Sequence, residues 1–244
     1  MLKILGMCGS PRDGNSKYLL EQALEASMTA AANMGVEAQT DYWSVRGKKI
    51  SGCVMCDGCA KDGKCIIKDD YQPAFELWQA ADVVIYSIPV YHMGIPAQLK
   101  AFIDRVGNSL FGRYASIFPK DAVSLPKSLK TIGCIAQGLH VFSGQEHTIT
   151  DIINHALIMG CIPVTGDMWQ SYIGAGGWTS NDAGRKALQE QYETGGSDAT
   201  IAVDASRKLA QRAVEIAVVV KAGGREMVQV LEKDPSYTPF LEKL

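Results

Sequence analysis

The sequence predicts an α/β fold in which a doubly wound, five-stranded parallel sheet carries helices on both faces. Short apolar runs alternate with stretches whose apolar residues recur at helical spacing, which is the pattern of repeated βαβ units. The first run, Leu2 to Cys8, leads through a glycine-containing turn into a helix over 15–34 that ends at Gly35. With 244 residues, the chain is long enough for one large α/β domain with extensions.

The same alternation predicts the remaining elements. The further strands are expected over residues 36–45, 82–88, 131–137 and 161–168. The further helices are expected over 71–81, 96–106, 144–159 and 199–222. We therefore expect one domain over 1–222, with a cysteine-rich loop over 46–69 after the second strand, and a polar C-terminal extension over 223–244.

Two connections are longer than a compact domain ordinarily uses. One spans 169–196 and is rich in glycine. The other, residues 107–128, contains apolar and proline residues, namely Phe111, Tyr114, Phe118, Pro119 and Pro126. We interpret this second segment as a lid or a subunit contact.

Charge and hydropathy exclude several classes of partner. The net charge is −2 and the isoelectric point is near 6.1, so there is no electrostatic footprint for nucleic acid. The apolar stretch from Val214 to Val220 is interrupted by Glu215 and is far shorter than a membrane span needs. Met1 to Cys8 does not resemble a signal peptide. We expect a soluble, cytoplasmic protein that binds neither nucleic acid nor membranes.

Four cysteines within thirteen residues, in the pattern C-x2-C-x2-C-x5-C, suggest a metal centre. They are Cys53, Cys56, Cys59 and Cys65. Three sulfurs at every third residue can surround one corner of a 4Fe-4S cube, and the fourth can reach the remaining iron. The last gap is longer than in the bacterial ferredoxin run, and Ile66 stands where that run has proline.

Other uses of these cysteines remain open. A four-cysteine zinc site normally takes two well-separated pairs, whereas this run crowds three sulfurs together. Disulfides suit small exported chains, and this chain lacks the signal peptide expected of one. Zinc or plain thiols are therefore the alternatives to a cluster.

The turn after the first strand predicts an anion site. It runs from Gly9 to Ser16, and such a loop points backbone amides and the positive end of a helix dipole at a ligand. Asn15 stands where a nucleotide-hydrolysing P-loop needs lysine, and the G-x-G-x-x-G pattern is absent. A monophosphate such as that of FMN fits better, and the expected ligands are Ser10, Arg12, Asn15 and Ser16. An ordinary capped helix start is the alternative.

Two further loops leave the same edge of the predicted sheet, where a ligand of an open parallel sheet binds. After the third strand come Pro89, Val90, Tyr91, His92, Met93 and Gly94. After the fourth come Gln137 and Gly138, which offer an amide side chain and a close backbone approach. We expect these residues to contact the ring and ribityl parts of a flavin.

Together these motifs resemble the iron-sulfur flavoprotein family, a branch of the NADPH-dependent FMN reductase superfamily with a flavodoxin-like fold. The resemblance covers about residues 1–220. It is carried by Gly-Ser-Pro-Arg-x-Gly-Asn-Ser, the cysteine run through Asp70, Pro89-Val90-Tyr91 and Lys100 to Arg105. It implies strand order 2-1-3-4-5, FMN at the switch point and a 4Fe-4S cluster on the four cysteines. It also implies dimers or tetramers that place a cluster near a neighbour's flavin.

The predicted function is electron transfer. A flavin exchanges electrons in pairs or singly, so it can connect NAD(P)H with a one-electron carrier such as ferredoxin. Under this hypothesis no side chain acts as a general acid or base. One alternative is a cluster-free NAD(P)H-dependent FMN or quinone reductase. The other is an electron carrier or redox sensor whose cysteine site is empty or holds zinc.

Overall fold

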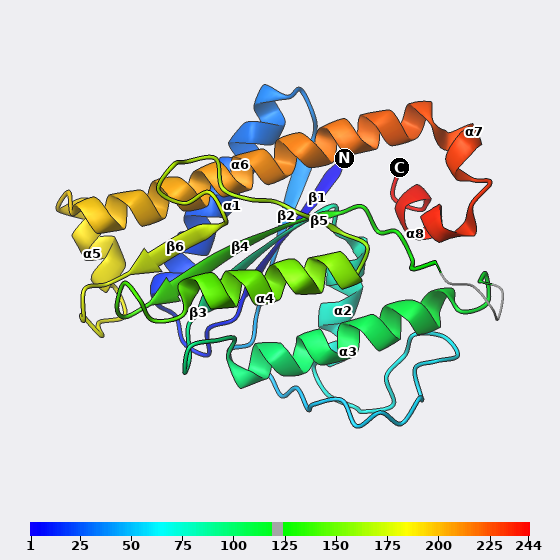
Figure 1. Cartoon of the computed structure of the whole chain (residues 1–244), viewed down its shortest axis with the longest axis horizontal. Helices are drawn as coiled ribbons and strands as arrows, with labels where there is room; N and C mark the ends of the chain where they lie inside the picture. The colour runs from blue at the N-terminus through cyan, green and yellow to red at the C-terminus, as the bar shows by residue number, and fades with distance from the viewer. Residues whose placement is uncertain (119–123) are drawn as a thin grey trace.

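The computed structural model describes residues 1–118 and 124–244, and its centre is a parallel sheet (Figure 1). The sheet order is β2-β1-β3-β4-β5, and the short β6 pairs with β4. The strands are β1 (Leu2–Cys8), β2 (Ala38–Ser44), β3 (Val83–Pro89), β4 (Thr131–Gly138), β5 (Ile162–Pro163) and β6 (Ala175–Trp178). This order confirms the predicted flavodoxin-like topology, in which strand order reverses between β1 and β3.

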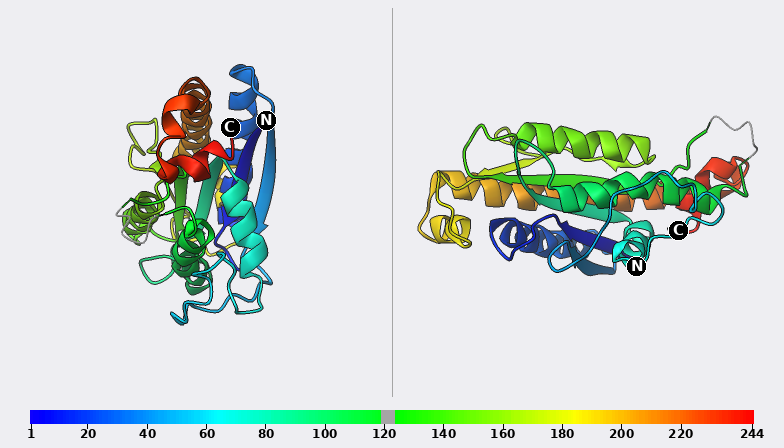
Figure 2. Two further views of the ribbon diagram at one scale, coloured as in Figure 1. Left: turned by 90° about the vertical axis from the view of Figure 1, so that its right-hand side faces the viewer. Right: turned by 90° about the horizontal axis from the view of Figure 1, so that it is seen from below.

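Helices cover both faces of the sheet (Figures 1 and 2). The longer helices are α1 (Asn15–Asn33), α2 (Tyr71–Ala80), α3 (Ala97–Tyr114), α4 (Gln145–Ile158) and α6 (Ser197–Glu226). The short ones are α5 (Ala187–Glu193), α7 (Val228–Leu231), α8 (Thr238–Leu241) and the 3₁₀ turn η1 (Pro235–Tyr237). Helices α1 and α6 pack side by side on one face, and α2, α3 and α4 cover the other.

Two apolar cores result, one on each face, because successive strand residues point to opposite sides. Leu5 and Met7 of β1 pack with α2, α3 and α4, whereas Leu2 and Ile4 pack with α1 and α6. Both faces are covered, so β3 and β4 are buried along almost their whole length and are mainly apolar, as the sequence predicts for a buried parallel sheet.

The fifth strand differs from its prediction. A continuous strand was expected over 161–168, but β5 ends at Pro163 and the edge position is completed by β6. β5 pairs with the start of β4 and β6 with its end, and residues 164–174 bulge out between them. The sequence of β6, Ala-Gly-Gly-Trp, lacks β-branched residues and therefore gave no strand signal.

The predicted connection over 107–128 is wrong for its first part. α3 continues to Tyr114, because Leu110 and Tyr114 extend its buried face despite Gly107 and Gly112. Pro119 lies outside the described residues, so that part of the prediction stays untested.

The expected polar tail contains further short helices. α6 runs through Gly223 and Gly224 to Glu226, beyond the predicted end at 222. The chain then folds back, and the buried ring of Phe240 lies where a side chain on Gly224 would have to go. Residues after 226 are thus packed onto the domain.

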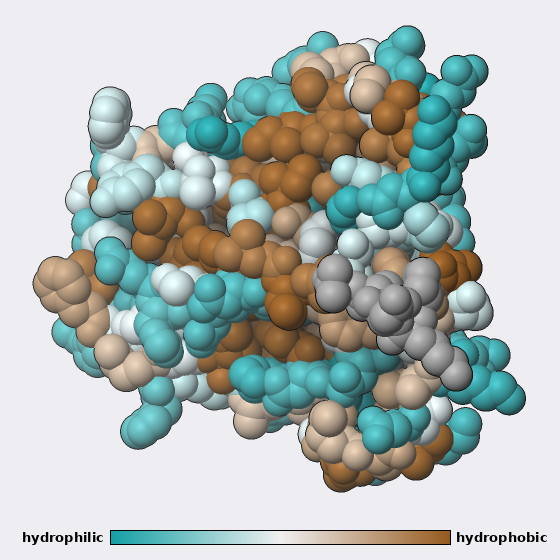
Figure 3. Space-filling model, turned by 45° about the vertical axis from the view of Figure 1, so that its right-hand side comes forward, coloured by the Kyte–Doolittle hydropathy of each residue, from teal (hydrophilic) through white to brown (hydrophobic). Residues whose placement is uncertain are grey.

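In the part of the chain that is described, no helix is both long and apolar enough to span a bilayer. On the face shown in Figure 3, hydrophobic side chains form separate patches among hydrophilic ones.

Candidate functional site

The turn after β1 is held against β3 by buried hydrogen bonds. The Gly9 N–H donates to the Ser87 carbonyl over 2.9 Å, and the Ser87 hydroxyl donates to the Ser16 carbonyl over 2.7 Å. The start of α1 is therefore fixed at the carboxyl edge of the sheet, next to the switch point.

This turn presents unpaired donors. Tyr18 is the first residue of α1 whose N–H reaches a helical carbonyl, that of Gly14. Among the described residues, the amides of Asn15, Ser16 and Lys17 donate to no backbone carbonyl, as expected for a first helical turn. Arg12 is exposed and has no ion-pair partner in the described chain. An anion would meet both the helix dipole and a free guanidinium.

A cleft of about 180 Å³ joins this turn to the loops after β3 and β4. Most of the residues expected to bind a flavin line it, from three separate segments of the chain. They are Ser10, Arg12, Asn15, Ser16, Pro89, Val90, Tyr91, Gln137 and Gly138. The fold thus brings together the three loops that the sequence analysis combined.

The other expected residues lie beyond this cleft. Tyr91 and Gly94 form a bridge that closes a tight turn, with His92 and Met93 in the left-handed region at its tip. Met93 faces an adjoining, mainly apolar cavity of about 440 Å³, together with Phe142, Tyr172 and other residues. His92 and Gly94 line neither cavity.

Gln137 carries an unfilled acceptor in the cleft. Its side-chain nitrogen donates to the Gly138 carbonyl, but its buried Oε1 has no donor among the described residues. Buried acceptors are nearly always satisfied, so this oxygen marks a place where a ligand donor belongs. The cleft therefore offers an anion end at α1 and an amide acceptor at β4, which fits the phosphate and the heteroaromatic ring of FMN.

Sequence reasoning missed one wall of the cleft. Thr179, Asp182 and Ala183 line it from the glycine-rich segment after β6, and Leu139 lines it from the loop after β4. The Asn15 side chain holds this wall in place, since it donates to the Gly184 carbonyl and accepts from the Leu188 N–H. Both polar atoms of the Asn15 side chain are thus engaged in structural hydrogen bonds. The side chain is therefore less available as the phosphate donor that the sequence analysis expected. The available signal in the sequence was the run of turn-forming residues Ser180, Asn181 and Asp182, of which the first two adopt positive φ in the structure.

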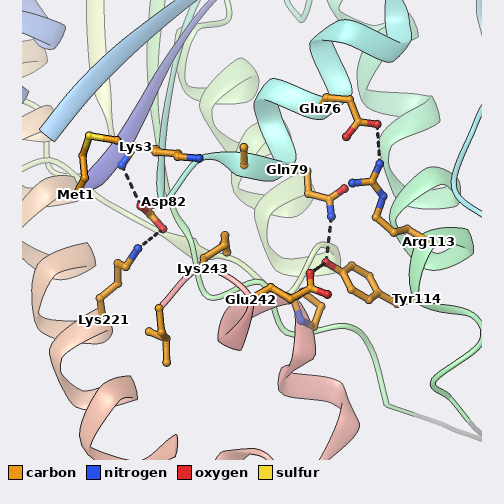
Figure 4. A pocket seen from close by; sticks show the side chains of 13 residues that line it. Met1, Lys3, Glu76, Gln79, Asp82, Arg113, Tyr114, Lys221, Glu242 and Lys243 are labelled. Carbon is orange, nitrogen blue, oxygen red and sulfur yellow. Dashed lines mark hydrogen bonds and ion pairs between the residues drawn. The ribbon is translucent and has the colours of Figure 1, made fainter.

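A second large cavity, of about 420 Å³, lies at the opposite edge of the sheet, beside the start of β1 (Figure 4). Its charged side chains are mostly paired with one another: Lys221 with Asp82, Arg113 with Glu76, and Tyr114 with Glu242. It is remote from the carboxyl ends of the strands, where ligands of such sheets bind.

The four predicted metal-binding cysteines share one small cavity. Cys53, Cys56, Cys59 and Cys65 all line it, and none is in a disulfide. Burial raises the pKa of the Cys59 thiol, and the nearness of the three other cysteines adds to the rise. The donor set, four reduced thiols at one place, matches the chemistry of an iron-sulfur or zinc site.

The cavity is tight as it stands. Its volume is about 20 Å³, about enough for one water molecule. Among the described residues, no three cysteine, histidine or acidic side chains gather closely enough to hold one metal ion. A metal cluster would therefore need a wider cavity than this one.

The C-terminal half of α3 supports the cysteine loop. A side chain on Gly112 would overlap the Cys59 carbonyl, and one on Gly63 would come within 2.5 Å of the Ser109 carbonyl. These glycines let the loop backbone lie directly on the helix. The first part of the segment interpreted as a lid or a subunit contact, residues 107–114, is thus a helix that carries the cysteine loop.

Comparison with known proteins agrees with this arrangement. Residues 2–163 match the family model of NADPH-dependent FMN reductases. An iron-sulfur flavoprotein of Archaeoglobus fulgidus is 34% identical over 176 residues, covering 72% of this chain and 82% of the relative. One from Methanosarcina thermophila is 32% identical over 193 residues, covering 79% of this chain and 91% of the relative.

Solved structures share the fold at low sequence identity. RosB matches with a TM-score of 0.60 and 11% identity, over 96% of this chain and 87% of its own. An azoreductase of Bacillus anthracis matches with a TM-score of 0.57 and 16% identity, over 86% of this chain and 99% of its own.

The topology, the anion-binding turn at the switch point and these relationships define a flavin-dependent oxidoreductase of flavodoxin-like fold. The chain belongs to the NADPH-dependent FMN reductase family and, within it, to the iron-sulfur flavoproteins.

Proposed function

We propose that this protein binds FMN and a 4Fe-4S cluster and passes electrons between NAD(P)H or a ferredoxin-like carrier and an acceptor. The observation that carries the proposal is the presence, in one chain, of a cleft with free amides at the carboxyl edge of the sheet and of a separate cavity lined by four free thiols. A flavin exchanges electrons in pairs with nicotinamides and singly with a cluster, so the two groups together would join both kinds of carrier.

The phosphate of FMN would be held at the start of α1. The amides of Asn15, Ser16 and Lys17 and the side chains of Ser10, Arg12 and Ser16 supply donors and positive charge. Gln137 and the turn after β3 would contact the ring. No acid or base among the side chains is needed for electron transfer.

The backbone of the cysteine loop supports a bound metal group. Met55 and Asp57 both adopt positive φ between the first three cysteines, although neither is glycine. Such conformations cost about 1–3 kcal/mol each and persist where other interactions compensate. Bonds from several thiolates to one metal group would supply that compensation.

The separation of the flavin cleft from the cysteine cavity within one chain favours an oligomer. No described residue lines both the cleft and the cysteine cavity, and the loop packs away from the cleft on α3. We propose that a homodimer or homotetramer places the cysteine loop of one subunit near the flavin cleft of another.

Metal and flavin analysis of anaerobically purified protein tests this function. We expect one flavin, four irons and four acid-labile sulfides per chain, with reduction of the flavin by NAD(P)H or by reduced ferredoxin. Replacing Cys56 and Cys59 by serine should remove the iron and leave the flavin. Flavin without iron in the wild type, with full turnover of both variants, would instead establish the cluster-free reductase. Zinc in place of iron would indicate the redox-sensing alternative.

A further inference from the structure

Arg105 is a buried cation with unused donors. Its side chain, on α3, is 2% exposed. Nη1 donates to Asp69 Oδ2 over 2.6 Å and to the Ser51 carbonyl over 3.1 Å. Nε and Nη2 are buried and have no acceptor in the described part of the chain. Leaving a buried charged donor unsatisfied is costly, so these two N–H groups are expected to have a partner.

The cavity that Arg105 lines holds five sulfur-bearing side chains, those of the four cysteines and Met55, besides the hydroxyl of Ser109. Arg105 lines the cavity formed by the four cysteines, and the carboxylate that lines it, Asp57, is on an exposed part of the loop. Asn108, one turn further along α3, already directs its side-chain nitrogen at Cys53 Sγ over 3.7 Å. The helix thus presents two polar side chains to the thiols.

The guanidinium has little freedom to turn away. It lies over the ring of Tyr71, 4.0 Å from the ring centre, which fixes its plane. Asp69 is itself held by the Ser51 and Tyr71 amides, over 2.8 and 3.1 Å. The fork is therefore oriented before any metal group binds, as supporting groups of metal sites commonly are.

We infer that Arg105 is a positioning residue of the cysteine site, whose Nε and Nη2 donate to the sulfurs of a bound metal group and stabilise its reduced, more negative state. This inference rests on the proposed cluster. Hydrogen bonds to the sulfurs are one of the means by which proteins set cluster potentials. Since Asp69 offsets most of the charge of Arg105, the effect should come chiefly from the directed N–H groups, which lysine cannot reproduce.

Redox titration of the holoprotein tests the inference. Two variants are compared with the wild type: Arg105→Lys, and Arg105→Gln combined with Asp69→Asn so that no carboxylate is left unpaired. In each, the equilibrium between reduced and oxidised cluster should shift at least tenfold toward the oxidised form. For a one-electron couple, a tenfold shift lowers the midpoint potential by about 59 mV. The cluster would be followed by electron paramagnetic resonance. The midpoint of the flavin should not change, because Arg105 does not line its cleft.

Arg113→Gln is the matched control. Arg113 lies on the same helix and pairs with the more exposed Glu76, but it does not line the cysteine cavity. The cluster potential of the Arg113→Gln variant should equal that of the wild type.

Unchanged cluster potentials in both folded Arg105 variants would overturn the inference and leave the proposed function intact. A wild-type protein without iron and sulfide would overturn both. Circular dichroism and flavin content establish folding. Both variants keep the net charge of the Arg105–Asp69 pair at zero, so a lower cluster potential in either one that folds reports the loss of the directed N–H groups.

Discussion

Lys221 Nζ lies 2.9 Å from Asp82 Oδ1, and this buried pair joins the C-terminal half of α6 to the residue before β3 (Figure 4). The other oxygen of Asp82 accepts the Lys3 N–H over 2.9 Å. One carboxylate thus ties together the start of β1, the start of β3 and a helix from the other end of the sequence.

Replacing Lys221 by methionine should destabilise the fold. Removing one partner leaves Asp82 buried without its counter-charge, which typically costs about 3–5 kcal/mol. Urea denaturation measures the difference in free energy of unfolding. Lys208→Met, an exposed lysine on the same helix, should change it by less than about 0.5 kcal/mol. A loss below about 1 kcal/mol for Lys221→Met would contradict a structural role for the pair.

Gly112→Ala should impair the metal site and spare the flavin site. The new methyl group would overlap the Cys59 carbonyl and push the loop off α3, although alanine itself favours the helix by about 1 kcal/mol. We expect lower iron content at unchanged flavin content. In the control, Gly107→Ala, the methyl group meets its neighbours at 3.8 Å, an ordinary contact, and should leave the iron content as it is. Equal iron in the two variants would disprove the role of Gly112.

Binding experiments should distinguish the contributions of the two ends of the flavin cleft. Gln137→Leu removes the unpartnered acceptor and should weaken FMN and riboflavin alike, by about 1 kcal/mol or roughly fivefold. Ser16→Ala should weaken FMN and leave riboflavin unaffected, because riboflavin lacks the phosphate. Fluorescence titration of the wild-type and both variant apoproteins with both flavins measures the six dissociation constants. A loss for riboflavin in Ser16→Ala would place the phosphate elsewhere.

His155 should make the fold sensitive to acid. Its ring is buried against Trp78 and Tyr86, and burial lowers its pKa from 6.5 to about 4. Between pH 6.5 and 4 the unfolded chain binds a proton that the folded chain does not, so stability falls as the pH falls, by about 3 kcal/mol over the window. His155→Gln should lose less stability than the wild type between pH 7 and 4.5 in urea denaturation. Carboxylates contribute equally to both proteins, so parallel curves would exclude His155 as the cause.

Local patterns predicted three loops that the structure brings to one cleft. The turn from Gly9 to Ser16, the exit of β3 and Gln137 are each read from a few consecutive residues, and the parallel topology then brings the three to one edge. The cysteine spacing likewise needs no tertiary information to identify four thiols at one place.

Features that depend on contacts between distant segments were not predictable. Gly107 and Gly112 suggest a break in α3, yet the helix continues because Leu110 and Tyr114 extend its buried face, and Gly112 leaves room for the Cys59 carbonyl. The strand β6 forms because Gly177 can approach Gln137, not because its own residues favour a strand.

Periodicity and short-range spacing indicated the fold class, the three loops at the carboxyl edge of the sheet and the four cysteines, whereas the strand order followed from the family resemblance. Only the tertiary structure decided which wall closes the cleft and that α3 carries the cysteine loop. Packing also places Arg105, with two unsatisfied donors, in the lining of the cysteine cavity. These features depend on burial and on unpaired groups, which exist only once segments far apart in the chain are packed together.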